Sequence, residues 1–369
     1  MPDLVALDLP GGDRFVDELR RAWDAGDAIA PIDQRLPDAA KSELIRRLGA
    51  AWVVDGRERH RLDTGQPVEP GDAAVIATSG STGTPKGVVL THAAIASSAE
   101  ATSARLGVRP DDHWLACLPL SHVGGLSVVF RALHLGTPLT VHPAFDPVAI
   151  EHTDATLVSL VATALRRIDP SRFRVIVLGG SRPPADRPAN SVATYGMTET
   201  GSGVVYDGLP LDGVDVRVVD GELELRGDML LRCYRDGTDP KGPDGWFPTG
   251  DLGELDAEGR VIVHGRRGDL IITGGENVWP EQTEAALLTH PGVADAAVYG
   301  RDDDEWGQAV TALIVPSDPT VPPTLDDLRA HVKSTLPAFC APRRVVTCHR
   351  IPRTTLGKIQ RAGLATLDR

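Results

Sequence analysis

The chain has 369 residues, of which 41% are hydrophobic and 24% are charged, and its 38 basic and 51 acidic side chains give a formal net charge of −13. This size and composition are typical of a globular protein with two domains. The negative charge disfavours a nucleic-acid-binding surface, and no apolar run approaches the roughly 18 residues that span a bilayer. We therefore expect no nucleic-acid partner and no stable membrane insertion.

The N-terminus has no basic segment followed by an apolar one, so it does not resemble a secretory signal peptide. The cysteines form no CxxC pair and no metal-type spacing with histidine, which is typical of reduced thiols. They are Cys117, Cys233, Cys340 and Cys348. Both features favour a cytoplasmic location.

A loop rich in glycine and hydroxyl residues lies between two apolar, strand-like runs at residues 73–77 and 88–90. Glycine lets the backbone approach an anion closely, and hydroxyl groups, backbone N–H groups and a lysine can donate to phosphate oxygens. The candidate ligands are Thr78, Ser79, Gly80, Ser81, Thr82, Gly83, Thr84 and Lys86. The pattern predicts binding of a nucleoside triphosphate. Because no Gly-Lys-Ser/Thr sequence ends the loop, it is not a Walker A loop.

Strand-like runs and helical patterns alternate from residue 73 to about residue 205, which predicts α/β units with a largely parallel sheet. Thr91 can cap a helix that ends near Gly107, and Gly136 can end a second helix that begins at Gly125. The further expected strands are at 113–118, 138–141 and 173–178.

The pattern changes after residue 213, where two hairpins, turning at Asp220-Gly221 and at Glu258-Gly259, predict a small antiparallel region. Beyond Gly265 the pattern predicts a compact α+β domain. Its expected helices are at 280–289 and 326–335, and its expected strands at 296–299 and 311–315. We predict an α/β protein: an N-terminal domain of residues 1–267 with a parallel sheet and a small antiparallel region, then a smaller α+β domain of residues 268–369.

Further short segments carry polar residues, and each by itself is typical of an ordinary turn or a surface charge. They are 118–125 (LPLSHVGG), 195–199 (YGMTE), 249–251 (TGD), 265–266 (GR), 274–278 (GGENV) and 352–358 (PRTTLGK). In this order, and together with the loop at 77–87, they resemble the acyl-adenylate-forming superfamily. The resemblance covers residues 73–361. It implies that the C-terminal domain is mobile and turns within residues 267–269.

The resemblance implies a role for each residue of the 195–199 segment that matches. Tyr195 and Gly196 would lie against adenine, and Thr198 would reach a phosphate oxygen. Glu199 would help to hold Mg²⁺, a cation that prefers carboxylate and phosphate oxygens.

The later segments would complete the nucleotide site. By resemblance, Asp251 and Arg266 would contact ribose. Lys358 would be the catalytic cation, because carboxylate attack on the α-phosphate builds negative charge that a positioned ammonium group stabilises.

Other matching segments imply an acyl pocket and a site for CoA. His122 would lie beside the reacting carboxylate as a wall or gate rather than a general base, because a carboxylate is already deprotonated at pH 7. Gly179 and Gly180 would form the pocket floor. Gly274 and Gly275 would line the pantetheine tunnel, which implies that a thioester forms after the adenylate.

Arg131 bears on the choice of acid, because it lies in a nearly apolar helix just after His122. It either reaches solvent with its tip or meets an anion, which a substrate with a second carboxylate would supply by bidentate pairing. Arg182 is a rival partner for that carboxylate. With the compact chain and the GGEN segment, this cation favours a resemblance to the o-succinylbenzoate-CoA ligases of menaquinone biosynthesis.

The predicted activity uses ATP, Mg²⁺ and CoA as well as a small carboxylic acid, and a homodimer is left open. Another aryl or fatty acid-CoA ligase and a stand-alone adenylation domain are the alternatives within the superfamily. The alternative from a different class is a non-catalytic nucleotide-binding module. That alternative does not explain why Glu199 and Lys358 are both present.

Overall fold

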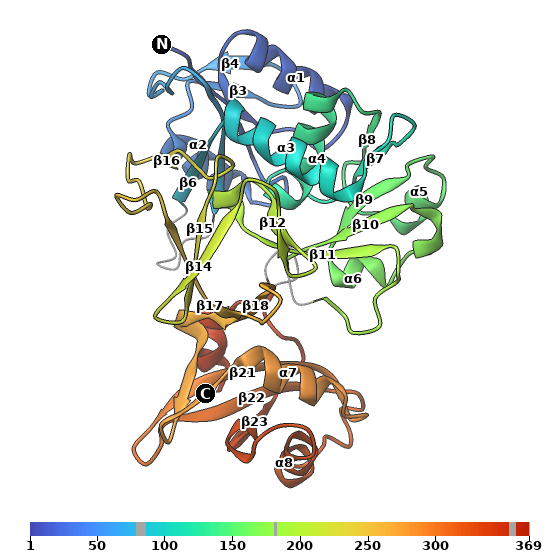
Figure 1. The fold of residues 1–369 in the computed structure, drawn as a ribbon, viewed down its shortest axis with the longest axis vertical. Coiled ribbons are helices and arrows are strands. Elements are labelled where there is room, and N and C mark those ends of the chain that lie inside the picture. Colours follow the sequence, from blue (N-terminus) through green and yellow to red (C-terminus); the bar gives the residue numbers. More distant parts are fainter. Residues whose placement is uncertain (79–85, 181–182, 354–358, 369) are drawn as a thin grey trace. The chain divides into compact units, whose positions relative to one another are not determined.

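The computed structural model describes residues 1–78, 86–180, 183–353 and 359–368 (Figure 1). The chain divides into two compact units that interleave in sequence. The first comprises Met1–Val216, Leu225–Phe247 and Gly259–Val261, and the second comprises Arg217–Glu224, Pro248–Glu258 and Ile262–Arg369. The boundary expected between residues 267 and 268 stays a prediction. None of the helices in the described ranges has the length and apolar content needed to cross a membrane.

The first unit contains a seven-stranded mixed sheet with the order β16-β6-β5-β2-β1-β3-β4. Its strands are β1 Leu4–Leu7, β2 Ala28–Pro31, β3 Trp52–Val54, β4 Arg59–Arg61, β5 Asp72–Thr78, β6 Lys86–Thr91 and β16 Cys233–Tyr234. The inner pairs β3-β1-β2-β5 are parallel, and β4, β6 and β16 add antiparallel pairs. The strands that precede residue 72 were not predicted. β1 and β2 are short and wholly buried, so they carry no alternation that would mark them as strands, and β3 and β4 are only three residues each.

A second seven-stranded sheet of this unit has the order β13-β12-β11-β10-β9-β7-β8. Its strands are β7 Trp114–Ala116, β8 Leu139–Val141, β9 Leu157–Leu160, β10 Val175–Leu178, β11 Ser191–Gly196, β12 Gly203–Tyr206 and β13 Leu209–Pro210. The pairs from β8 to β11 are parallel, as predicted, and β12 and β13 continue the sheet in antiparallel pairs. The predicted largely parallel sheet is therefore two mixed sheets.

The helices of the first unit begin and end at local signals. Thr91 Oγ1 accepts a hydrogen bond from the N–H of Ala94 at 3.1 Å, and Gly107 and Gly136 end their helices with positive φ, as predicted. The two helices that these residues bound, α3 and α4, lie side by side (Figure 1). The helices are α1 Asp13–Asp24, α2 Asp38–Leu48, α3 His92–Leu106, α4 Val123–Leu135, α5 Pro147–Glu151 and α6 Ala162–Leu165, with 3-10 turns η1 Pro170–Arg172 and η2 Thr198–Thr200.

The antiparallel region forms a four-stranded sheet with the order β14-β15-β17-β18. Its strands are β14 Asp215–Val219, β15 Glu222–Arg226, β17 Phe247–Leu255 and β18 Val261–Arg266. Asp220 and Gly221, between β14 and β15, have φ values of +49° and +77°. Two successive positive φ values are what a tight hairpin turn of this hand requires, so the predicted hairpin is confirmed.

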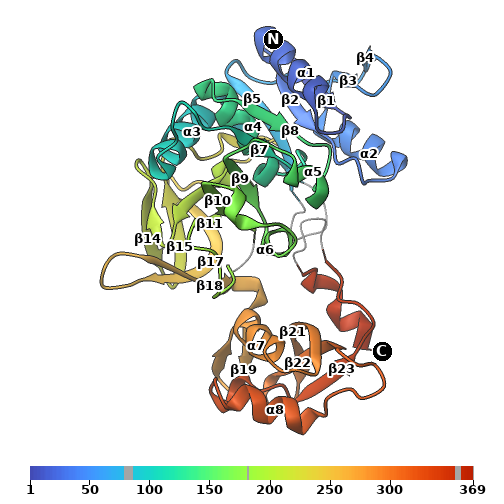
Figure 2. The ribbon, with the colours of Figure 1, turned by 90° about the vertical axis from the view of Figure 1, so that its right-hand side faces the viewer.

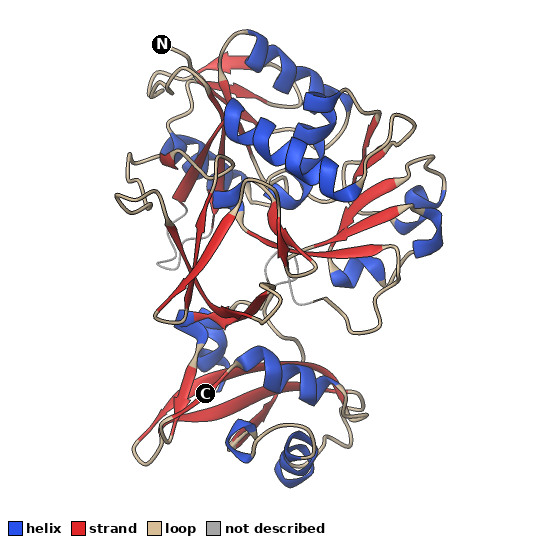
Figure 3. Cartoon of the chain, in the orientation of Figure 1, coloured by secondary structure: helices blue, strands red, loops and turns tan. Residues whose placement is uncertain are grey.

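The second unit contains a five-stranded sheet, in which β20, β19, β22 and β21 follow one another and β23 also pairs with β22 (Figure 2). Alternate residues of β21 face two cores: Ala296 and Val298 pack with α7 and α8, whereas Ala297 and Tyr299 pack with Leu364. The elements are η3 Arg267–Asp269, β19 Ile271–Thr273, β20 Glu276–Val278, α7 Pro280–Leu288, β21 Val293–Asp303, β22 Gly307–Pro316, α8 Leu325–Lys333, η4 Ala338–Cys340, β23 Arg344–Thr347 and η5 Arg361–Asp368. Helices and strands mix in both units, which confirms the predicted α/β class (Figure 3).

Candidate functional site

The two ends of the predicted phosphate loop are neighbours in one sheet. Thr78 ends β5 and Lys86 begins β6, and these two residues pair across the antiparallel strands. The Thr78 hydroxyl donates to the Lys86 carbonyl oxygen at 3.4 Å. The loop therefore returns to the strand next to the one it leaves. Six of the candidate phosphate ligands lie outside the described residues: Ser79, Gly80, Ser81, Thr82, Gly83 and Thr84.

Tyr234 joins two residues that were predicted to act on phosphate and metal. The Lys86 ammonium lies 4.8 Å from the centroid of the Tyr234 ring. The Tyr234 hydroxyl donates to Glu199 Oε1 at 3.1 Å. The structure thus brings Lys86 and Glu199 to opposite parts of one side chain. The sequence analysis missed Tyr234, because only the pairing of β16 with β6 brings it to this site.

The segment that carries Tyr195 and Thr198 turns sharply after β11. The pairing of β11 with β12 shifts register between Tyr195 and Gly196. A Cβ atom at Gly196 would lie 2.2 Å from the carbonyl oxygen of Ser202, so only glycine fits there. Buried Thr200 accepts from the Met197 N–H at 2.9 Å and so ties the turn η2, in which Thr198 and Glu199 lie.

Asp251 and Arg266, the predicted ribose pair, are brought together in the second unit. Arg266 Nε lies 2.8 Å from Asp251 Oδ1, and Arg266 NH1 donates to the Thr249 carbonyl at 2.8 Å. Gly250 has a φ of +73°, and its N–H donates to Glu222 Oε1 at 2.8 Å. Glu222 therefore supports the turn that presents Asp251. No sequence motif pointed to Glu222, because it lies on a different strand.

His122 is the N-cap residue of α4, and its imidazole lies beside two residues that were not predicted from the sequence. Arg35 NH2 lies 3.3 Å from His122 Nε2, and Asp33 Oδ2 lies 3.6 Å from the same nitrogen. Arg35 and Asp33 also form an ion pair at 2.7 Å. Burial lowers the pKa of His122, an effect that Asp33 opposes and Arg35 reinforces. The imidazole is therefore neutral at pH 7, which suits a pocket wall better than a general acid.

Arg131 does not reach solvent, since it is only 2% exposed. Its NH2 group donates to Ser127 Oγ at 3.0 Å and to Ser202 Oγ at 2.9 Å, and the guanidinium carbon lies 4.8 Å from the Trp114 ring centroid. NH1 is buried and has no hydrogen-bond partner among the residues that the structure describes. Within the described ranges no carboxylate pairs with it. Burial lowers the pKa of Arg131, with opposition from Tyr206.

The predicted pocket and tunnel glycines lie at two turns. Gly179 and Gly180 follow β10, and the Gly179 N–H donates to the Leu160 carbonyl at 3.1 Å. Arg182 lies outside the described residues. Gly274 and Gly275, with φ values of +60° and +83°, form the turn between β19 and β20.

Lys358 also lies outside the described residues, but residues on both sides of its segment form specific hydrogen bonds and ion pairs. Arg353 and Ile359 form a β-bridge, and Arg353 pairs with Asp295 at 2.6 Å. Arg361 lies deeper, among three carboxylates. Its nitrogen atoms lie 2.5 Å from Glu284, 2.9 Å from Glu281 and 3.2 Å from Asp269.

The residues present fit a magnesium ion that arrives with a nucleotide. Among the described residues, no group of three or more His, Cys, Asp or Glu side chains forms a protein-only metal site. Mg²⁺ is usually bound by one or two carboxylates together with substrate phosphates and water. Glu199, hydrogen-bonded by Tyr234, supplies such a carboxylate.

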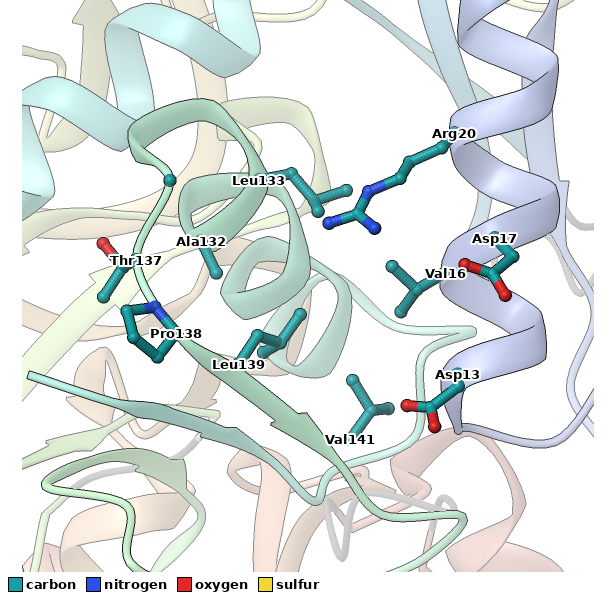
Figure 4. Close-up of a pocket in the computed structure, with 11 residues that line it drawn as sticks. Asp13, Val16, Asp17, Arg20, Ala132, Leu133, Thr137, Pro138, Leu139 and Val141 are labelled. Carbon is teal, nitrogen blue, oxygen red and sulfur yellow. The ribbon is translucent and has the colours of Figure 1, made fainter.

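A groove of about 560 Å³ lies between α1 and the end of α4 (Figure 4). Arg20 of α1 faces Leu133 of α4 across it, and Leu139 and Val141 of β8 form its lower part. Of the predicted site residues that lie in the described ranges, none lines this groove. We therefore do not assign the predicted chemistry to it.

Comparison with known proteins gives two family matches along the chain. The model described as "AMP-binding enzyme" matches residues 27–234, and the model described as "AMP-binding enzyme C-terminal domain" matches residues 282–358. A probable 2-succinylbenzoate-CoA ligase of Mycobacterium tuberculosis (strain ATCC 25618 / H37Rv) is 41% identical over 334 residues, which cover 82% of this chain and 86% of the relative. A 2-succinylbenzoate-CoA ligase of Bacillus cytotoxicus is 36% identical over 339 residues, covering 79% and 69%.

Solved structures match nearly the whole chain. The o-succinylbenzoate CoA synthetase of Bacillus subtilis in complex with the acyl-adenylate intermediate OSB-AMP has a TM-score of 0.87 and 27% identity, and covers 98% of this chain and 88% of that one. The same synthetase in complex with ATP and a magnesium ion also has a TM-score of 0.87 and 27% identity, with coverages of 98% and 89%.

Proposed function

Because the chain belongs to the family of AMP-binding enzymes, we propose that it is an ATP-dependent o-succinylbenzoate-CoA ligase of menaquinone biosynthesis. The observation that carries this proposal is the 41% identity, over 82% of the chain, to the probable 2-succinylbenzoate-CoA ligase of Mycobacterium tuberculosis. The proposed product is o-succinylbenzoyl-CoA, made by way of an acyl-adenylate.

In the first half-reaction, a carboxylate oxygen of the acid attacks the α-phosphorus of ATP. The bond from that phosphorus to the bridging oxygen breaks, and pyrophosphate leaves. We assign binding of the ATP polyphosphate to Lys86 and to the hydroxyl and glycine residues of the 78–84 loop. Lys358 is assigned to the α-phosphate, where its ammonium group stabilises the charge that develops during attack.

The remaining nucleotide contacts are assigned to the 195–199 segment and to Asp251. Tyr195 and Gly196 would lie against adenine, and Thr198 would donate to a phosphate oxygen. Asp251, held by Arg266 at 2.8 Å, would accept hydrogen bonds from ribose. Glu199 would hold Mg²⁺, which supplies charge neutralisation to the phosphates when bound.

In the second half-reaction, the CoA sulfur attacks the acyl carbonyl carbon, the thiol proton is lost and AMP leaves. The turn at Gly274 and Gly275 is assigned to the path of pantetheine. His122 would bound the acid on the adenylate side as a neutral imidazole, since its pKa is lowered by burial. Gly179 and Gly180 would form the floor of the same pocket.

The test is an assay of AMP and pyrophosphate release with ATP, Mg²⁺ and CoA, using o-succinylbenzoate, benzoate and a medium-chain fatty acid in turn. We expect o-succinylbenzoate to give CoA-dependent AMP release well above the other acids. ADP as product, or activity with amino acids only, would overturn the proposal. Equal use of the three acids would instead make the chain a general aryl or fatty acid-CoA ligase.

A further inference from the structure

Tyr234 occupies a fixed place beside the phosphate end of the proposed nucleotide site. Its strand β16 pairs with β6 in a register that sets Tyr234 against Val88. The residue before Cys233, Arg232, forms a bidentate pair with Asp72, with both N to O distances at 2.8 Å, and Asp72 is only 1% exposed. Bidentate Arg-carboxylate pairs are geometrically specific. The Tyr234 side chain is therefore presented by a rigid strand.

The hydroxyl of Tyr234 acts on a carboxylate that is also held through its backbone. The N–H of Leu231 donates to the Glu199 carbonyl oxygen at 2.7 Å, which joins the β16 segment to η2. The Tyr234 hydroxyl then donates to Glu199 Oε1 at 3.1 Å. A carboxylate that binds a metal ion is commonly oriented by a hydrogen bond from a second residue of this kind.

The ring of Tyr234 acts on a cation. The Lys86 ammonium group lies 4.8 Å from the ring centroid, within the range in which the ring's negative face attracts a cation. Lys86 is exposed, so without such a contact its long side chain would sample many rotamers. The contact restricts the ammonium group to the ring of Tyr234, the side chain whose hydroxyl also bonds Glu199.

We infer that Tyr234 is a positioning residue of the nucleotide site, whose hydroxyl orients Glu199 toward Mg²⁺ and whose ring places Lys86 for the polyphosphate. This inference rests on the proposed function, because it takes Glu199 and Lys86 as ligands of the Mg-nucleotide. It assigns a task to a side chain that makes no direct contact with the reacting atoms.

The test separates the hydroxyl from the ring by calorimetric titration of the full chain with α,β-methylene-ATP, at varied Mg²⁺ and in EDTA. Tyr234→Phe keeps the ring and is expected to raise the apparent Kd for Mg²⁺ about 10-fold. Its affinity for the analogue in EDTA should not change. Tyr234→Leu removes both groups and should also weaken binding in EDTA by roughly 2- to 5-fold.

Tyr206→Phe is the matched control. The Tyr206 hydroxyl, like that of Tyr234, lies within hydrogen-bond distance of one side-chain partner in the first unit, Thr102 Oγ1 at 3.2 Å. Unchanged Mg²⁺ affinity in Tyr234→Phe, or an equal loss in Tyr206→Phe, would overturn the inference while leaving the proposed function in place. If the unaltered chain shows no Mg²⁺-dependent binding of the analogue, the proposed function itself fails, and the inference fails with it.

Discussion

Arg131 places a positive charge inside the first unit, and no carboxylate of the described residues pairs with it. Two serine hydroxyls satisfy NH2, but NH1 stays buried without an acceptor among the described residues. An uncompensated buried charge costs stability, and one explanation for keeping it is that a ligand supplies the anion. The second carboxylate of o-succinylbenzoate has the required charge and can form a bidentate pair.

We expect Arg131→Leu to raise the KM for o-succinylbenzoate by about 10- to 150-fold, because a charge-assisted hydrogen-bonded pair is worth about 1.5 to 3 kcal/mol. The KM for ATP should hardly change. The free energy of unfolding should not fall by more than about 1 kcal/mol, since the variant removes a buried charge that lacks a protein counter-ion. Steady-state kinetics and urea titration measure these quantities. Normal kinetics in Arg131→Leu together with a loss in Arg182→Leu would move the carboxylate to the pocket floor.

His122 is expected to titrate below its usual pKa of 6.5, because burial disfavours the imidazolium. Between the lowered folded value and 6.5, the unfolded chain binds more protons than the folded one. The contribution of this residue to stability is therefore constant above about pH 6.5 and falls as the pH decreases below it. An NMR titration of the histidine Hε1 signals, with His122→Gln to assign the resonance, measures the pKa. A value of 6.5 or above would mean that Asp33 outweighs burial.

At the scale of secondary-structure elements, Arg361 connects the start of η5 to α7 and to η3. Burial alone would lower its pKa, but the hydrogen bonds that Arg361 donates to Glu284 and the negative charges of Glu284, Glu281 and Asp269 raise it. Glu284 is itself only 6% exposed, and its Oε1 accepts the Val298 N–H at 2.7 Å. One cation thus compensates several partly or fully buried carboxylates.

We expect Arg361→Gln to destabilise the second unit by about 3 to 5 kcal/mol, because it leaves the Glu284 carboxylate buried without a counter-ion. The double variant with Glu284→Gln should recover part of the loss, since the buried charge is then also removed. Hydrogen exchange of the amides of β21 and β22 in the full chain reports this locally.

Arg353→Gln is the control for that measurement, because its pair with Asp295 is 34% and 29% exposed. A pair this exposed contributes about 1 kcal/mol or less. If Arg353→Gln and Arg361→Gln destabilise the unit equally, burial of the Arg361 cluster is not what makes it important.

At the scale of the whole molecule, we expect two segments that are far apart in the sequence, those of Lys358 and of Gly274-Gly275, to serve different half-reactions. Lys358→Ala should slow adenylation by about 10²-fold or more, because it removes a charge partner of the transition state. It should still convert a supplied acyl-adenylate to the thioester. Single-turnover assays of each half-reaction measure the difference. Equal damage to both half-reactions would contradict this division of labour.

Gly275→Ala is the complementary variant and should slow thioester formation more than adenylation. The added Cβ at Gly275 meets no atom within 4 Å, so the strain comes only from its φ of +83°. At Gly274 a Cβ would lie 2.7 Å from the Trp306 ring. A Gly274 variant would therefore disturb packing as well as the turn, and its effect on thioester formation could not be attributed to the turn alone. A Gly275→Ala variant with normal thioester formation would remove the turn from the proposed CoA path.

The sequence by itself determined features whose causes are local in the chain. The Thr91 cap, the end of α3 at Gly107 and the hairpin turn at Asp220-Gly221 are all found as predicted, because each depends on the conformational preference of one or two residues. The order of the motifs was likewise sufficient to indicate the family of AMP-binding enzymes, which the matches over residues 27–234 and 282–358 confirm.

Only the tertiary structure decided which side chains meet. Tyr234 reaches Lys86 and Glu199 because β16 pairs with β6. Arg131 is buried, and it donates a hydrogen bond to Ser202, which lies far along the chain. β1 and β2 pair into the first sheet although their short apolar runs have no periodicity of their own. Long-range strand pairing and burial depend on the free energy of the whole fold, and no local pattern encodes them.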